Sequence, residues 1–399
     1  MGIITGLDIG TANIKTLIVQ KKPNEEELEV LGQTRKTSSG MRKGVVINIE
    51  KVSDFIKSAL DEAQEISNKK IKSVFVNVGG AHVFSTTSHG LISVSRADQK
   101  ISQEDIERVI QAAQTFSLSP NKEILAVYPK EFTVDDEKGI KEPLGMKGVR
   151  LETEVLVLGG FSPYLKNLTQ AVLEAGFQID DLILTPLASS RAILTSREKE
   201  LGVALLDIGA GTTGLAVFEE GGLIHTTILP IGSAHITNDI AIGLRCDIDT
   251  AEKIKLKSGT CLLKGTDKKK KTETIPGEIL TFSQRKLNRI IQARVSEIFE
   301  QINKELKKIS RQALLPGGIV LTGGGAKLPK IKDLAKKELK LPCRIGIPQG
   351  FSPPLENPEL AAVCGLVLLG ADLEIERTFP AFSKEILSRF KKIFKIFLP

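Results

Sequence analysis

The sequence predicts an α/β protein of two related domains, each built on a mixed sheet flanked by helices. Three observations support this fold class. A strand–turn–strand segment at residues 4–19 recurs at residues 203–218. An apolar strand at residues 318–322 ends in three glycines and leads into a helical pattern. Residues 82–160 break the alternation of strands and helices, which indicates an inserted α+β unit.

The two repeated segments share one pattern: an apolar strand, an aspartate, a tight turn of small residues and a second apolar strand. The first carries Asp8, Gly10, Thr11, Asn13 and Lys15, and the second carries Asp207, Gly209, Gly211, Thr212 and Thr213. Small turn residues let backbone N–H groups close on an anion. An aspartate beside each turn can hold water around Mg²⁺, which prefers few carboxylates and several waters. Two such hairpins facing each other predict a polyphosphate, and hence a nucleotide, in a cleft between the domains.

The glycine-ending strand strengthens this prediction. A single Asp-x-Gly-Thr turn is more often plain structure, but here two copies accompany a third element. Gly323, Gly324 and Gly325 would let a flat ring approach the backbone, which suits adenine. Strand, glycines and helix occur in this order without the G-x-x-x-x-G-K-[ST] pattern, so a Walker loop is excluded.

Composition indicates an ordinary soluble protein. Of 399 residues, 41% are hydrophobic and 26% charged, and the four cysteines lack metal-ligand spacing, as expected of free thiols in a reducing cytoplasm. The net charge of +7 is concentrated in residues 264–271 and 384–399, each +4, which leaves −1 for the remainder. A nearly neutral body argues against a nucleic-acid partner. The 264–271 run is expected to be a solvated loop.

Periodicity predicts the elements between the motifs. Helices are expected at 52–66, 162–175, 187–195, 233–242, 250–256, 283–306, 327–339 and 359–369, and strands at 74–78 and 182–184. Within the insert we expect strands at 91–95, 124–128, 131–134 and 154–158. A helix there begins at Ser102, with Asp105 three residues on as in a capping box.

These motifs resemble the actin-type ATPase superfamily, and within it the FtsA family of bacterial cell division proteins. Asp8–Lys15 is similar to the superfamily's first phosphate motif, Asp207–Thr213 to the second, and Gly323–Gly325 to the adenosine motif. Residues 101–109 and 139–152 resemble the FtsA family's own subdomain 1C, which actin, sugar kinases and chaperones lack. Residues 186–190 and 202–205 also match that family.

The resemblance implies an actin-like two-domain fold with a nucleotide cleft and a set of domain boundaries. These are subdomain 1A at 1–81 and 161–195, inserted subdomain 1C at 82–160, 2A at 196–232 and 306–372, 2B at 233–305, a linker at 373–382 and a membrane-targeting helix at 383–399.

It also implies ATP and Mg as cofactors. Lys15 would reach the terminal phosphates, Glu252 and Lys255 would contact the ribose and adenine, and Asp8 and Asp207 would position Mg-bound water and assist catalysis. The remaining cofactor contacts would be Gly10, Thr11, Asn13, Gly209, Gly211, Thr212, Thr213, Gly323, Gly324 and Gly325.

Two positions depart from the family pattern. Thr185 stands where relatives often have an acidic residue that orients the attacking water, and Gly214 stands where many have aspartate. Nucleotide binding requires neither group, whereas efficient hydrolysis depends on positioning the water. We therefore expect ATP binding with at most slow ATPase activity.

The C-terminal stretch has the pattern of an amphipathic helix. One face would carry Ile386, Leu387, Phe390, Ile393, Phe394 and Phe397, and the rest is basic, including Lys391, Lys392 and Lys395. At about 16 residues it is too short to span a bilayer but suits its interface. A helix packed on its own domain is the alternative. The resemblance to FtsA proteins favours binding to anionic inner-membrane lipid.

The resemblance further implies an actin-like polymer that tethers the FtsZ ring to the cytoplasmic face of the inner membrane and recruits later division proteins. The FtsZ C-terminal tail would bind subdomain 2B, where Arg285, Arg289 and Arg294 flank the apolar Ile290 and Ile291. A solvated helix flank is the alternative interpretation of these arginines.

Two other functions belong to the same superfamily. A metabolic kinase would need a catalytic aspartate and a sugar pocket, but neither the 82–160 insert nor the basic tail. A pilus-assembly actin homologue such as PilM would be expected to lack such a tail.

Overall fold

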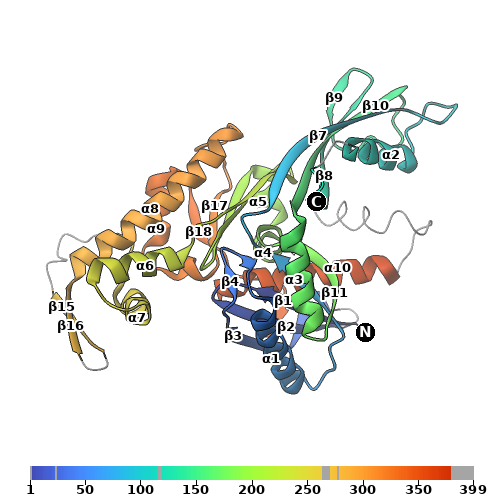
Figure 1. Ribbon diagram of the computed structural model, residues 1–399. Helices are drawn as coiled ribbons and strands as arrows, with labels where there is room; N and C mark the ends of the chain where they lie inside the picture. The colour runs from blue at the N-terminus through green and yellow to red at the C-terminus, as the bar shows by residue number, and fades with distance from the viewer. Residues whose placement is uncertain (1, 23–24, 116–118, 263–269, 276–277, 379–399) are drawn as a thin grey trace.

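The computed structural model describes residues 2–22, 25–115, 119–262, 270–275 and 278–378. Three large sheets and their helices build this part of the chain (Figure 1). Two small two-stranded sheets are also present. One pairs β4 (Met41–Arg42) with β5 (Val45–Val46), and the other pairs β15 (Lys270–Ile275) with β16 (Glu278–Ser283).

The first sheet has six strands in the order β11-β6-β1-β2-β3-β19. Their bounds are Gln178–Leu184, Ser73–Val78, Ile3–Ile9, Asn13–Lys21, Leu28–Thr37 and Phe351–Ser352. Strands β1, β2 and β3 form an antiparallel meander, and β6 runs parallel to β1.

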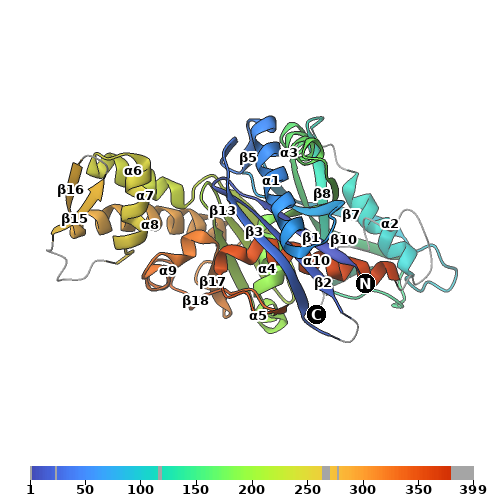
Figure 2. The same cartoon turned by 90° about the horizontal axis from the view of Figure 1, so that it is seen from below.

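Helices cover both faces of this sheet (Figure 2). They are α1 (Ile49–Ser67), α3 (Ser162–Glu174), α4 (Thr185–Ile193) and α10 (Ala361–Thr378). Helix α1 lies over Gly32, whereas α10 lies over Gly6 on the opposite face. Because neither glycine has a side chain, each helix can approach the sheet backbone closely.

The second sheet repeats the meander in the order β14-β13-β12-β17-β18. Its strands are Gly222–Leu229, Thr213–Glu219, Val203–Ile208, Gly318–Thr322 and Cys343–Ile345. Strands β12, β13 and β14 are antiparallel, and β17 runs parallel to β12 as β6 does to β1. The predicted repeat of the core topology is therefore present.

Helices of the second half share a separate apolar core with this sheet. They are α6 (Ser233–Leu244), α7 (Ile248–Ser258), α8 (Gln284–Lys308) and α9 (Ile331–Leu339). Short helices complete the fold: α5 (Ser196–Leu201), η1 (Gly324–Lys327) and η2 (Pro358–Leu360).

The chain returns to the first sheet after β18, which corrects the boundary expected for subdomain 2A. We expected residues 306–372 to belong to 2A, yet β19 pairs with β3, and α10 packs on β1, β2 and α4. Val363, Leu366 and Val367 of α10 are fully buried in the first core. The apolar pattern predicted a buried helix here, but such a pattern does not specify which sheet the helix covers.

The third sheet forms the insert, which projects away from the other two sheets (Figure 1). It is antiparallel in the order β7-β10-β8-β9, with strands Phe84–Ser93, Arg150–Phe161, Lys122–Val134 and Glu137–Ile140. The strands expected at 124–128 and 131–134 are one strand, β8. Pro129 lies at a bulge, where the register passes from Glu131 opposite Glu154 to Pro129 opposite Val155. A proline, which cannot donate to the ladder, is tolerated at such a bulge.

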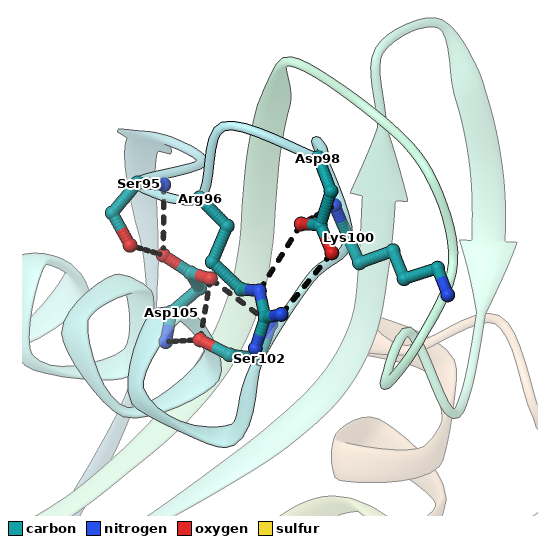
Figure 3. Close-up of polar contacts among 6 residues, drawn as sticks. All are labelled: Ser95, Arg96, Asp98, Lys100, Ser102 and Asp105. Carbon is teal, nitrogen blue, oxygen red and sulfur yellow. Dashed lines mark hydrogen bonds and ion pairs between the residues drawn. The ribbon is translucent and has the colours of Figure 1, made fainter.

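Helix α2 (Gln103–Gln114) of the insert begins with the predicted capping box (Figure 3). The backbone N–H of Ser102 donates to Asp105 Oδ2 at 3.0 Å, and the hydroxyl of Ser95 donates to Asp105 Oδ1 at 2.8 Å. Burial alone would raise the pKa of Asp105, but the hydrogen bonds from Ser102 and Ser95 outweigh it and lower the pKa to about 2. One carboxylate thus caps the helix and holds the preceding loop.

Candidate nucleotide-binding site

Hairpins β1–β2 and β12–β13 have the same turn. The N–H of Gly10 donates to the carbonyl oxygen of Asn13 at 3.0 Å, and the N–H of Gly209 donates to that of Thr212 at 2.9 Å. The residues opposite the aspartates differ. Lys15 is the cross-strand partner of Asp8, whereas Gly214 is the cross-strand partner of Asp207.

The two turns line a single cavity of about 360 Å³. They approach closely, since a Cβ added to Gly211 would lie 2.6 Å from Thr11 Oγ1. Fourteen predicted residues line it: Asp8, Gly10, Thr11, Asn13, Lys15, Asp207, Gly209, Gly211, Thr212, Glu252, Lys255, Gly323, Gly324 and Gly325. The fold thus brings three distant motifs together.

Thr213 does not line the cavity, which corrects its assignment as a nucleotide contact. Its side chain is buried, and its hydroxyl donates to the carbonyl oxygen of Ile231 at 2.8 Å. Thr212 belongs to the turn and lines the cleft, whereas Thr213 is the first residue of β13 and its side chain turns into the protein.

The two aspartates have different electrostatic surroundings. Lys15 Nζ lies 2.7 Å from Asp8 Oδ2, and both side chains are largely buried. Burial alone would lower the pKa of Lys15, but the charge and hydrogen bond of Asp8 outweigh it and raise the pKa. Burial raises the pKa of Asp207 to about 6, although the Ser189 hydroxyl donates to its carboxylate. The cavity therefore holds one ion-paired carboxylate and one that ionises near neutral pH.

The glycine turn closes one side of the cavity. Gly323 has a φ of +79°, and a Cβ there would lie 2.4 Å from Asp207 Oδ1, so a side chain is excluded. Gly324 has room, because its added Cβ would be 3.4 Å from the nearest atom, Glu359 Oε1. The N–H of Gly323 also donates to the carbonyl oxygen of Pro358 at 3.1 Å. This bond joins the glycine turn to the segment that precedes α10.

Helices α6 and α7 form another wall. The first helical residue, Ser233, donates its N–H to the carbonyl oxygen of Gly209 at 2.8 Å, which fixes α6 against the second turn. Lys255 of α7 is buried, and its ammonium donates to Thr237 Oγ1 at 2.8 Å. The same ammonium lies 2.6 Å from the carboxylate of Glu252. A charged pair thus lines the cavity beside the glycine turn.

Several other lining residues were not identified from the sequence, among them Arg35, Asn77 and Glu359. Asn77 Oδ1 accepts from the N–H of Ile9 at 2.7 Å. Glu359 lies 3.9 Å from Arg35 Nε and 3.4 Å from Lys327 Nζ. No local motif marks these positions: Arg35 lies on β3 opposite Lys15, and Asn77 and Glu359 belong to elements remote from the hairpins in the chain. The one available signal was Asn77 itself, a polar residue within an apolar strand.

Comparison with known proteins identifies the family. The chain is 37% identical over 377 residues to cell division protein FtsA of Pseudomonas aeruginosa, covering 92% of this chain and 89% of that protein. It is 36% identical over 368 residues to that of Bacillus subtilis, covering 92% and 82%, and 31% identical over 383 residues to that of Escherichia coli K12, covering 93% and 90%. The chain belongs to the FtsA family. Two family models agree: "Cell division protein FtsA" matches residues 204–365, and "SHS2 domain inserted in FTSA" matches residues 80–158.

Solved structures confirm the predicted actin-like fold. The PilM–PilN type IV pilus biogenesis complex aligns with a TM-score of 0.66 at 18% identity, covering 92% of this chain and 98% of that one. MreB5 of Spiroplasma citri bound to ADP aligns with a TM-score of 0.56 at 13% identity, covering 94% and 98%. At these identities the likeness concerns the fold alone, so the likeness to PilM does not favour a pilus function over the FtsA assignment.

Of the three arginines predicted to bind a partner in this FtsA-family chain, two are exposed and one is paired within the domain. Arg285 and Arg289 of α8 are exposed. Arg294 makes a bidentate pair with Asp239 of α6, at 2.6 and 2.9 Å. Ile291 is fully buried in the second core, so our expectation that it contacts a partner is wrong. It lies on the apolar stripe by which α8 packs on its own domain.

Two sequence-based predictions fall outside the described residues. They concern the basic run at 264–271, of which only the backbone of 270–271 is described, and the lipid-contacting residues of the C-terminal stretch. Among the residues that the structure does describe, no helix combines the length and apolarity needed to cross a bilayer.

Proposed function

We propose that this chain binds Mg-ATP between hairpins β1–β2 and β12–β13. Two like turns around one cavity carry the proposal, because each offers backbone N–H groups and an aspartate to a polyphosphate. Lys15 would bind the terminal phosphates, and Asp8 and Asp207 would hold Mg²⁺ through water. The adenosine would occupy the side lined by Gly323, Gly324, Gly325, Glu252 and Lys255. Bound Mg²⁺ would neutralise phosphate charge.

Substitution of Gly324 tests the adenosine site. Gly324→Leu should abolish ATP binding in a titration with a fluorescent ATP analogue, because the side chain would enter the cavity. Gly324→Ala is the matched control, since a Cβ fits there at 3.4 Å from its nearest neighbour. Both variants should keep the wild-type melting temperature. Wild-type affinity in the folded leucine variant would rule out this site for the adenine.

We further propose that the chain is an actin-like polymer-forming adaptor in cell division. Membership of the FtsA family supports this role. Residues 383–399 would bind anionic lipid and hold the FtsZ ring at the cytoplasmic face of the inner membrane, where later division proteins join it. One short amphipathic helix binds lipid reversibly, whereas a row of them on a polymer binds firmly through avidity.

Co-sedimentation with anionic liposomes, with and without ATP and FtsZ, tests this adaptor role. The full chain should pellet with liposomes, and a chain ending at residue 382 should stay in the supernatant while still binding ATP. Phe394→Glu should act like the truncation because it charges the apolar face. Ser388→Glu, which adds the same charge to the polar face, is the matched control. A truncated chain that still pellets would refute the lipid assignment.

The FtsZ C-terminal tail would bind at the basic flank of α8. Arg285 and Arg289 are free of the Asp239 pairing that engages Arg294, and arginine pairs with carboxylates bidentately. Arg289→Glu should weaken binding of an FtsZ tail peptide by about 2 kcal/mol or more if the partner buries the contact. Lys304→Glu reverses an exposed charge further along α8 and should leave affinity unchanged. Wild-type affinity in Arg289→Glu would move the docking site elsewhere.

A further inference from the structure

Asn77 occupies the point where strands β1 and β6 separate beside the cleft. Their parallel ladder pairs Gly6 with Phe75 and Leu7 with Val76. Two residues further on, the Asn77 side chain replaces the backbone partner, and its Oδ1 accepts from the N–H of Ile9 at 2.7 Å. A backbone N–H can only donate, so the atom facing it must be the amide oxygen. This single contact fixes which way the amide points.

The other end of the amide then faces Thr185. Asn77 Nδ2 lies 3.1 Å from Thr185 Oγ1 and donates to it. The contact is tightly enclosed, since a Cβ on Gly79 would lie 2.8 Å from that oxygen. A hydroxyl has one proton, and the NH₂ group of Asn77 cannot accept it. The Thr185 proton therefore points away from Asn77, and both residues line the cavity.

We propose that Asn77 orients the Thr185 hydroxyl as a hydrogen-bond donor to the terminal phosphate of a nucleoside triphosphate. This inference rests on the nucleotide site proposed above. Asn77 is the positioning residue, and Thr185 makes the contact. Thr185 is also the first residue of α4, where the positive end of the helix dipole favours an anion. Only a triphosphate has the phosphate that accepts this hydrogen bond, so the contact distinguishes ATP from ADP. A threonine at this position holds the phosphate but lacks the carboxylate with which relatives orient the attacking water.

The ratio of ATP to ADP affinity, measured by isothermal titration with Mg²⁺ present, tests this assignment. Thr185→Val removes the hydroxyl at constant shape and should lower the preference for ATP about tenfold, the value of one hydrogen bond to a charged group. Thr185→Ser keeps the hydroxyl and should keep the ratio. Asn77→Asp retains an acceptor for the N–H of Ile9 but also accepts the Thr185 proton, so it should lower the ratio as well.

A double variant separates orientation from added charge. If Asn77→Asp acts through the hydroxyl, its effect on the ratio should shrink in the Thr185→Val background, because coupled residues are not additive. An equal effect in both backgrounds would refute the orienting role of Asn77. Wild-type protein that binds ATP and ADP, with an unchanged ratio in Thr185→Val, would overturn this inference alone. Wild-type protein that binds neither nucleotide would overturn the proposed function with it.

Discussion

The β1–β2 and β12–β13 hairpins have one backbone plan and two charge arrangements. Their turns make the same hydrogen bond, and their aspartates stand at the same place in the ladder. The first aspartate faces Lys15 across the strands, whereas the second faces Gly214 and receives a hydrogen bond from Ser189 of α4. The first hairpin therefore carries its own counter-ion, and the second depends on its neighbours.

Packing by α4 explains this difference. A Cβ on Gly214 would lie 3.2 to 3.3 Å from three ring carbons of Pro186, near the start of α4. A side chain like that of Lys15 would press against this ring. The comparison teaches that a repeated motif specifies a repeated backbone, while the elements packed over each copy decide which charges it can carry.

Of the substitutions that test this difference between the hairpins, removal of Lys15 should change the free energy of unfolding most. Lys15→Met leaves the buried Asp8 without its counter-charge, and breaking a buried pair in this way typically costs about 3 to 5 kcal/mol. Urea unfolding should show this loss. The double variant Asp8→Asn/Lys15→Met removes both charges and should recover most of the stability. Equal stability of Lys15→Met and wild type would mean that the pair is not a structural feature of the first hairpin.

Asp207 should make the stability of the protein depend on pH. Its pKa rises from 3.8 to about 6 on folding, so the folded protein keeps a proton that the unfolded chain releases. Stability should therefore fall as the pH rises from about 4 to about 6, by about 3 kcal/mol in full. Asp207→Asn should remove this part of the pH dependence when unfolding is measured without Mg²⁺ or nucleotide. An identical pH profile in the variant would contradict the assignment.

A side chain at Gly214 should have a smaller effect. Gly214→Ala presses a methyl group against Pro186, and overpacking of this kind costs about 1 to 3 kcal/mol. Thermal or urea unfolding measures the change. Gly222→Ala is the matched control, because an added Cβ there would lie 3.7 Å from its nearest atom. Gly139 is unsuitable as a control, because its positive φ would strain an alanine. Unchanged stability in Gly214→Ala would mean that α4 shifts at little cost. Packing by α4 would then not explain why Asp207 has no lysine opposite it.

Local sequence patterns were sufficient for the features whose causes are local. The Asp-Gly turns, the glycine-ending strand and the capping box of Ser102 and Asp105 each involve residues a few positions apart. The repeat of the meander also followed from the sequence, because apolar strands and small turn residues recur at the same spacing. The turns and the glycine-ending strand supplied twelve of the predicted residues that line the cavity, and the family resemblance supplied Glu252 and Lys255.

Only the tertiary structure decided which faces meet. Thr212 and Thr213 are adjacent and chemically alike, yet one lines the cleft and the other donates to Ile231. Ile291 is an apolar residue among arginines, a pattern that suits a partner contact, but it packs in the second core. Helix α10 packs on the first sheet instead of the second. Asn77 and Thr185 meet across 108 positions of the chain. Periodicity predicts which face of a helix or strand is apolar and which is polar. The connections between strands determine which element packs against that face, and no local pattern in the sequence specifies which element this is.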